Sequence, residues 1–168
     1  MNQVTSGFKI IKEALPPRWE YLKDIPTVKY ASYNQVKDLY SDYYDVHSLV
    51  TDMVLLLDKP KENIRIDIRY WKKLSVGERQ CFNMNWHYDC FNDPTDIRGV
   101  GNEHLFFISG ADCKTEFLNG FAPEDHIIWY PHEAIHRATK AKAEGPRILV
   151  RVSYAPQIPV RGLVRQML

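Results

Sequence analysis

The sequence lacks the features that mark secreted, membrane-spanning and repeat proteins. Its three cysteines (Cys81, Cys90 and Cys113) include no Cys-x-x-Cys pair, so we expect reduced thiols in a cytosolic compartment and no disulfide framework. The longest apolar run of the N-terminal half, Met53–Leu57, is far too short to cross a bilayer. The first residues show no secretory signal, and the chain contains no internal repeat or low-complexity tract.

Excess charge is also small, because the 168 residues carry a formal net charge of +1. Simple bulk attraction to nucleic acid is therefore not expected. The charge is uneven, since Arg137–Leu168 holds seven Lys or Arg and one acid. A basic end can indicate a polyanionic partner, but a solvated surface with one or two buried functional arginines is the favoured interpretation. The hydrophobic fraction of 45% is ordinary for one globular domain.

The first sixty residues predict a mixed, mostly helical lead-in. Lys9–Leu15 is a short segment that Pro16-Pro17 stops, and Tyr33–Leu57 has apolar residues at helical spacing up to Lys59-Pro60. We therefore expect a single domain over residues 1–168, with a helix-rich lead-in at 1–61, a β core at 62–156 and a C-terminal tail at 157–168.

The rhythm changes to period two after Pro60. Apolar and polar residues alternate strictly over Asn63–Tyr70, which predicts a strand. Turn-forming residues separate the other expected strands, which are Gln80–Asp89, Glu103–Ser109, Thr115–Leu118, His126–Tyr130 and Arg147–Tyr154. Short, evenly spaced strands are typical of an antiparallel sandwich or barrel.

Candidate chemistry begins at His87 and Asp89. On a strand these two side chains project from one face, about 6.6–7 Å apart, so both can reach one ion. The pair alone is a weak signal, but His136 follows 49 residues later. On the last expected strand Arg151 shares a face with Arg147 and Ser153.

Two arginines beside an apolar run are costly unless they meet an anion. Arg151 and Ser153 together offer a planar fork and a hydroxyl donor, which suit a carboxylate.

With these residues in place, the sequence resembles the Fe(II)- and 2-oxoglutarate-dependent oxygenases. The matching residues are His87-Tyr88-Asp89, then Asp125–Pro131 leading to His136, then Arg151-Val152-Ser153. The resemblance covers about residues 62–156. It implies a mainly β fold with N-terminal helices, built on a double-stranded β-helix (jelly-roll or cupin-like) barrel.

The resemblance also implies roles for individual residues. His87, Asp89 and His136 would be the facial triad of Fe(II), which leaves open positions for O2 and for the cosubstrate 2-oxoglutarate. Arg151, helped by Ser153, would anchor the distal carboxylate of 2-oxoglutarate. Arg147 also lies at a family-like distance from His136, so the resemblance leaves open which of the two arginines makes this salt bridge. Asn83 and Asn85 would share the inward face of the His87 strand, within reach of the cosubstrate or substrate. The implied reaction is hydroxylation or oxidative demethylation of an unidentified small molecule, protein side chain or nucleobase.

Two alternatives remain open. His132-Glu133-Ala134-Ile135-His136 matches the HExxH signature of zinc hydrolases. Pro131 and the absence of a third ligand downstream count against it, because that signature needs a helix around its first histidine. A non-oxidative, cupin-like metal-binding or ligand-binding module would share the fold and the metal ligands, but it would not need the arginine clamp.

Overall fold

The computed structural model describes residues 7–81 and 84–164. Its helices are α1 (Tyr33–Leu39) and α2 (Tyr44–Leu57), with 3-10 turns at Trp19–Tyr21, Lys61–Asn63 and Ile97–Gly99. Its strands are β1 (Lys9–Glu13), β2 (Thr27–Ala31), β3 (Ile64–Leu74), β4 (Glu103–Ser109), β5 (Thr115–Phe117), β6 (Gly120–Phe121), β7 (His126–Pro131), β8 (His136–Ala138), β9 (Gly145–Tyr154) and β10 (Gly162–Val164).

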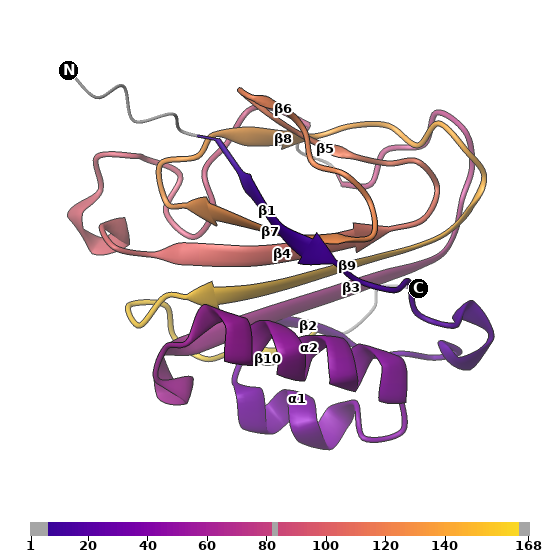
Figure 1. Cartoon of the computed structure of the whole chain (residues 1–168), viewed down its shortest axis with the longest axis horizontal. Coiled ribbons are helices and arrows are strands. Elements are labelled where there is room, and N and C mark those ends of the chain that lie inside the picture. Colours follow the sequence, from indigo (N-terminus) through magenta and orange to yellow (C-terminus); the bar gives the residue numbers. More distant parts are fainter. Residues whose placement is uncertain (1–6, 82–83, 165–168) are drawn as a thin grey trace.

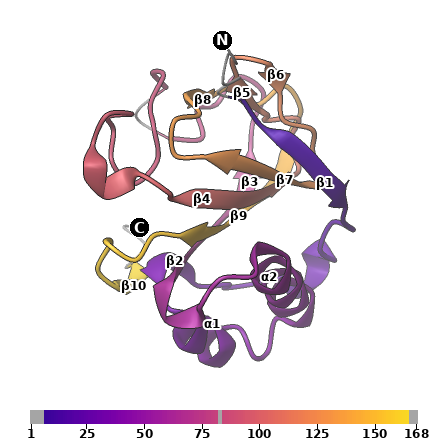
Figure 2. The ribbon, with the colours of Figure 1, turned by 60° about the vertical axis from the view of Figure 1, so that its left-hand side comes forward.

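The strands form a large and a small antiparallel sheet. The large sheet has seven strands in the order β1-β7-β4-β9-β3-β2-β10, and the small sheet has three in the order β6-β5-β8. Figures 1 and 2 show the small sheet over one face of the large sheet and the two helices against the opposite face. No continuous ladder joins the two sheets into a closed barrel in the described part of the chain.

The long pair β3–β9 runs through the centre of the large sheet. Ile64, Ile66 and Ile68 alternate along β3 and are fully buried, where they pack in the main core with residues of α1 and α2. The opposite face of the same strands looks toward the small sheet, and its antiparallel register sets Asp67 opposite Arg151. The alternation predicted from the sequence therefore assigns one face to the core and leaves the other for polar side chains.

The expected helix-rich lead-in contains strands as well as helices. Tyr33–Leu57 is helical, in two helices interrupted at residues 40–43, and Ser32 and Gln35 form a capping box at the start of α1. Lys9–Glu13 is not helical but is an edge strand whose residues are all exposed and which pairs with β7. β2 also lies in this segment, and β10 of the expected tail pairs with it, so the large sheet draws strands from all three expected segments.

The expected strand Gln80–Asp89 is wrong. Its described residues form a loop that contacts β8 through an isolated bridge between His87 and His136. Arg79, just before this loop, makes a second isolated bridge with Lys140. Cys90 adopts a left-handed φ of 66°, which ends any extended pairing directly after Asp89.

Two further sequence-based expectations concern cysteines and membranes. Cys81, Cys90 and Cys113 form no disulfide in the described part of the chain. Among the described residues, neither helix has the length and apolar character to cross a bilayer.

Candidate metal centre

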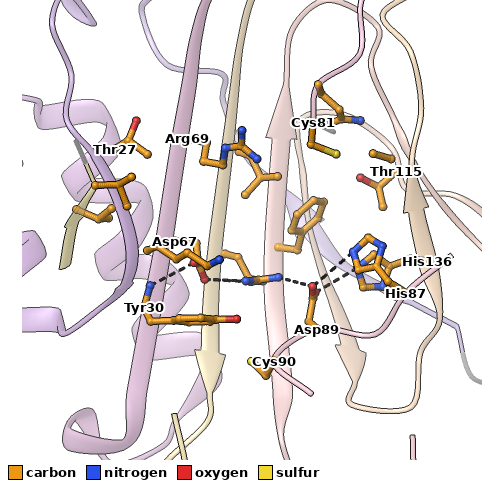
Figure 3. A pocket seen from close by; sticks show the side chains of 18 of the residues that line it. Thr27, Tyr30, Asp67, Arg69, Cys81, His87, Asp89, Cys90, Thr115 and His136 are labelled. Carbon is orange, nitrogen blue, oxygen red and sulfur yellow. Dashed lines mark hydrogen bonds and ion pairs between the residues drawn. The ribbon is translucent and has the colours of Figure 1, made fainter. Parts of the chain in front are cut away.

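A cavity of about 840 Å³ lies where the small sheet faces the large one. Its walls come from β2 and β3 of the large sheet, from β8 and β5 of the small sheet, and from the loop that carries His87 and Asp89. Figure 3 shows His87, Asp89 and His136 grouped on one side of this cavity, with Asp67 on the other. The sequence-predicted triad is therefore brought together, although a loop and not a strand supplies two of its members.

The three side chains present donor atoms to a single point. One ligand atom each from His87, Asp89 and His136 lies within 4.8 Å of the other two. Asp89 Oδ2 is 3.2 Å from His136 Nε2, and Asp89 Oδ1 is 3.8 Å from His87 Nε2. The main chains of the two histidines also hold each other, because each peptide N–H donates to the other residue's carbonyl oxygen, at 2.9 and 3.0 Å.

The backbone fixes which nitrogen of each imidazole faces the cavity. His87 Nδ1 lies 2.9 Å from the carbonyl oxygen of Asn85, and His136 Nδ1 lies 3.0 Å from that of Ala134. A carbonyl can only accept, so each Nδ1 carries a proton and Nε2 is the nitrogen that each ring turns toward Asp89, where its lone pair would bind a cation. Metal-binding histidines are oriented in this way.

The donor set fits a divalent metal ion. Two lone pairs facing a buried carboxylate repel it unless a proton or a cation lies between them. Burial alone lowers the pKa of His136, but the adjacent Asp89 carboxylate outweighs burial and raises it. Two imidazole nitrogens and one carboxylate oxygen are the ligand types of mononuclear non-haem iron sites with open positions.

An ion-pair chain crosses the cavity from Asp89 to the large sheet. Arg151 Nη1 lies 2.6 Å from Asp89 Oδ1, and Nε and Nη2 of the same guanidinium donate to Asp67 Oδ2 at 3.1 and 2.9 Å. Asp67 in turn accepts from the peptide N–H of Tyr30 at 3.2 Å (Figure 3). Burial opposes ionisation of Asp89, but Arg151 and His136 hold its pKa well below the ordinary value.

A second layer of buried side chains supports Asp89 from behind. Tyr130 Oη donates to Asp89 Oδ2 at 2.5 Å, and the ring of His104 stacks on Tyr130 with 4.8 Å between centroids. His104 Nδ1 is 2.7 Å from Ser153 Oγ, and both residues are fully buried. Ser153 therefore serves His104 and does not line the cavity beside Arg151.

Two other predicted cosubstrate residues, Arg147 and Asn85, do not line the cavity. Arg147 is fully buried, donates to the carbonyl oxygen of Cys113 and lies over the indole of Trp71. Its Nη1 has no hydrogen-bond partner among the residues that the structure describes. Asn85 is exposed and supplies its carbonyl to His87, whereas Asn83 lies outside the described residues.

The HExxH reading is wrong, because the segment is not helical. β7 ends at Pro131, a turn follows, and β8 begins at His136. His132 turns away from the metal centre, with Nε2 at 3.0 Å from the carbonyl oxygen of Asp93, and Glu133 is exposed. The zinc-protease geometry needs both histidines on one helical face.

Sequence reasoning missed three polar residues of the site. Asp67 and Arg69 look ordinary in a period-two strand, since every second residue there is polar. Tyr130 lies in an apolar run that predicts core packing. Asp67 is recognised as a site residue only through its pairing with Arg151 in the β3–β9 ladder. A single sequence does not show which distant strands pair.

Comparisons with known proteins agree with this geometry at the level of fold. No protein-family model and no curated protein matches the chain. A structure of prolyl 4-hydroxylases from Phytophthora capsici is similar with a TM-score of 0.57 at 14% identity, over 91% of this chain. This chain spans only 60% of that one.

The non-heme monooxygenase ThoJ, solved as a nickel complex and as the apo protein, is similar with a TM-score of 0.50 at 11% identity. It matches 97% of this chain and 82% of its own. The expected resemblance to the Fe(II)/2-oxoglutarate-type oxygenases is confirmed as a likeness of fold.

Proposed function

We propose that this protein is an Fe(II)- and 2-oxoglutarate-dependent oxygenase that hydroxylates or demethylates an organic substrate. His87, Asp89 and His136 bind the iron, and the two facing sheets are those of a double-stranded β-helix. The observation that carries the proposal is the convergence of two Nε2 lone pairs on one buried carboxylate, inside a cavity large enough for a cosubstrate and a substrate.

The similar folds support the same activity class, because the chains compared are a prolyl hydroxylase and a non-heme monooxygenase. Iron, when bound with its keto-acid cosubstrate, would supply the activation of O2. The residues of this chain orient the ligands and shield them from water. Arg151 and Tyr130 hold the two oxygens of Asp89 in place, so the carboxylate is aimed before the metal arrives.

The decisive measurement is an anaerobic titration of the metal-free protein with Fe(II) and 2-oxoglutarate. A chelated keto acid on Fe(II) gives a visible metal-to-ligand charge-transfer band, which we expect for the wild type. H87A and D89A should bind iron at least about 10-fold more weakly and give no band, because each loses one of three protein ligands. H47A changes a histidine of α2 outside the cavity and should behave as the wild type.

The outcomes separate the candidate functions. Iron binding without a band would favour a non-oxidative, cupin-like module that uses the same ligands. Unchanged iron affinity in both H87A and D89A would contradict the metal site itself.

A further inference from the structure

The cavity has a second polar end, away from the metal centre. Arg69 lies on β3 two residues beyond Asp67, and Figure 3 shows both side chains projecting into the cavity, with Arg69 on the side of Thr115 and Cys81. Successive residues on one face of a strand are about 6.6–6.8 Å apart. Arg69 therefore lies one such step along β3 from Asp67, the partner of Arg151.

The guanidinium of Arg69 has no carboxylate partner among the described residues. Within residues 7–81 and 84–164, the acids that line the cavity are Asp67 and Asp89, and both are paired with Arg151. The cavity wall also includes the uncharged side chains of Thr115, Gln80, Cys81 and Leu149, and Lys29 of β2 is a further cation that lines it. A guanidinium that faces a cavity without a counter-ion can form charge-assisted hydrogen bonds to an anionic ligand there.

Arg151, in contrast, already forms ion pairs with two carboxylates of the protein. Each of its three guanidinium nitrogens lies within 3.1 Å of a carboxylate oxygen of Asp67 or Asp89. A ligand carboxylate at this position would either displace one of these acids or become the third negative group around one cation. Displacing Asp89 would also disturb the proposed metal ligand.

Trp71 holds Arg69 in position. The guanidinium of Arg69 lies over the indole of Trp71 at 4.8 Å from the ring centroid, and that of Arg147 lies over the same indole at 4.8 Å. Arg147 is opposite Trp71 in the β3–β9 ladder and is fixed by two hydrogen bonds to the carbonyl oxygen of Cys113. The buried arginine thus anchors the indole, and the indole presents the accessible arginine to the cavity.

We propose that Arg69 binds the distal carboxylate of the 2-oxo dicarboxylate cosubstrate, whereas Arg151 positions the metal ligand Asp89. This inference rests on the proposed function. It assigns the anion contact to β3 and replaces the assignment to Arg151 and Ser153 made from the sequence.

The test compares two keto acids that differ only in the distal group. Fe(II)-loaded protein is titrated anaerobically with 2-oxoglutarate and with 2-oxopentanoate, which has the same chain length but no second carboxylate, and the charge-transfer band gives both dissociation constants. The wild type should prefer 2-oxoglutarate. R69Q should lose about 10-fold to 100-fold of that preference, through weaker 2-oxoglutarate binding alone, because one charge-assisted contact is lost.

Two further variants keep the result interpretable. R69K retains the charge and should recover part of the preference, while K72Q removes an exposed cation from the other face of β3 and should keep it in full. Calorimetric titration of the Ni(II)-loaded protein with the same two acids provides a second readout that needs no iron.

The result has three distinguishable outcomes. A wild-type preference that R69Q leaves intact overturns the assignment to Arg69 while the proposed function stands. Collapse of the preference in R151Q and not in R69Q returns the contact to Arg151. The absence of 2-oxoglutarate binding by the metal-loaded wild type overturns the proposed function and this inference together.

Discussion

Tyr130 orients the proposed metal ligand Asp89 through its hydroxyl group. Its ring is buried against Phe117 and His104, and its Oη donates to Asp89 Oδ2. Burial raises the pKa of Tyr130 well above the ordinary value, with Asp89 adding to the shift, so the hydroxyl stays protonated. Y130F preserves the packing but removes the donor, and we expect metal affinity to fall about 10-fold. Calorimetric titration with Mn(II) measures this, with Y154F as control; equal affinity in Y130F would refute the role.

His104 contributes a pH-dependent part of the stability. Burial lowers its pKa to about 3 from the ordinary 6.5. Between these values the unfolded chain takes up a proton that the folded protein does not. The contribution of His104 is therefore complete above about pH 6.5 and declines as the pH falls, by about 1.4 kcal/mol per pH unit. H104Q removes this titration but keeps a polar partner for Ser153.

Denaturant unfolding of the metal-free protein at pH 7, 6 and 5 tests this expectation for His104. The stability advantage of the wild type over H104Q should shrink steadily as the pH falls. Parallel curves for the two proteins would show that the imidazole does not titrate in this way.

At the scale of elements, the turn after β4 shows how closely two strands approach. Gly110 has a φ of 96°, and a Cβ there would lie 2.0 Å from the carbonyl oxygen of Pro146 in β9. G110A must therefore strain both the turn and the β4–β9 pair. G77A is the matched control, since its φ of 84° carries the same conformational cost but nothing lies within 4 Å. We expect G77A to cost about 1 kcal/mol and G110A about 1–3 kcal/mol more; urea unfolding giving equal losses would contradict this.

Elements with strong local patterns could be predicted from the sequence, and elements held by distant partners could not. Strict alternation identified β3, and the helical spacing of Tyr33–Leu57 identified the helical stretch. β1 has no buried face, and Lys9–Glu13 forms a strand because it pairs with β7. Its strand conformation depends on the pairing with β7, so its residues show no alternation of apolar and polar side chains that would predict a strand.

The same limit applies to the candidate site. The order and spacing of His87, Asp89 and His136 predicted a cluster that the structure brings together. The partners of Arg151 could not be predicted, because one lies across the β3–β9 ladder and the other in the loop. Two acids on one guanidinium are a property of the folded register, so the carboxylate clamp expected at Arg151 and Ser153 looked free in the sequence.

For the whole molecule, the metal centre lies at the junction between the sheets. His136 belongs to the small sheet, the loop supplies His87 and Asp89, and Arg151 ties Asp89 to the large sheet. A bound ion would therefore link parts that the described strand ladders leave separate, and it would favour the folded state by mass action. At a free metal concentration 100 times the dissociation constant, the gain is about 2.7 kcal/mol, or about 5–10 °C in Tm for a chain of this size.

Thermal unfolding with and without Mn(II) or Fe(II) under anaerobic conditions measures this gain. D89A should lose about half or more of the metal-dependent shift, because its carboxylate is the acidic ligand of the cluster and a roughly 10-fold weaker affinity halves the gain at this metal concentration. E116A removes a carboxylate that pairs with Arg137 in the small sheet, so it should keep the full shift even if its metal-free Tm falls. Equal metal-dependent shifts in Tm for D89A and the wild type would mean that the ion binds elsewhere. The metal would then not stabilise the junction between the two sheets.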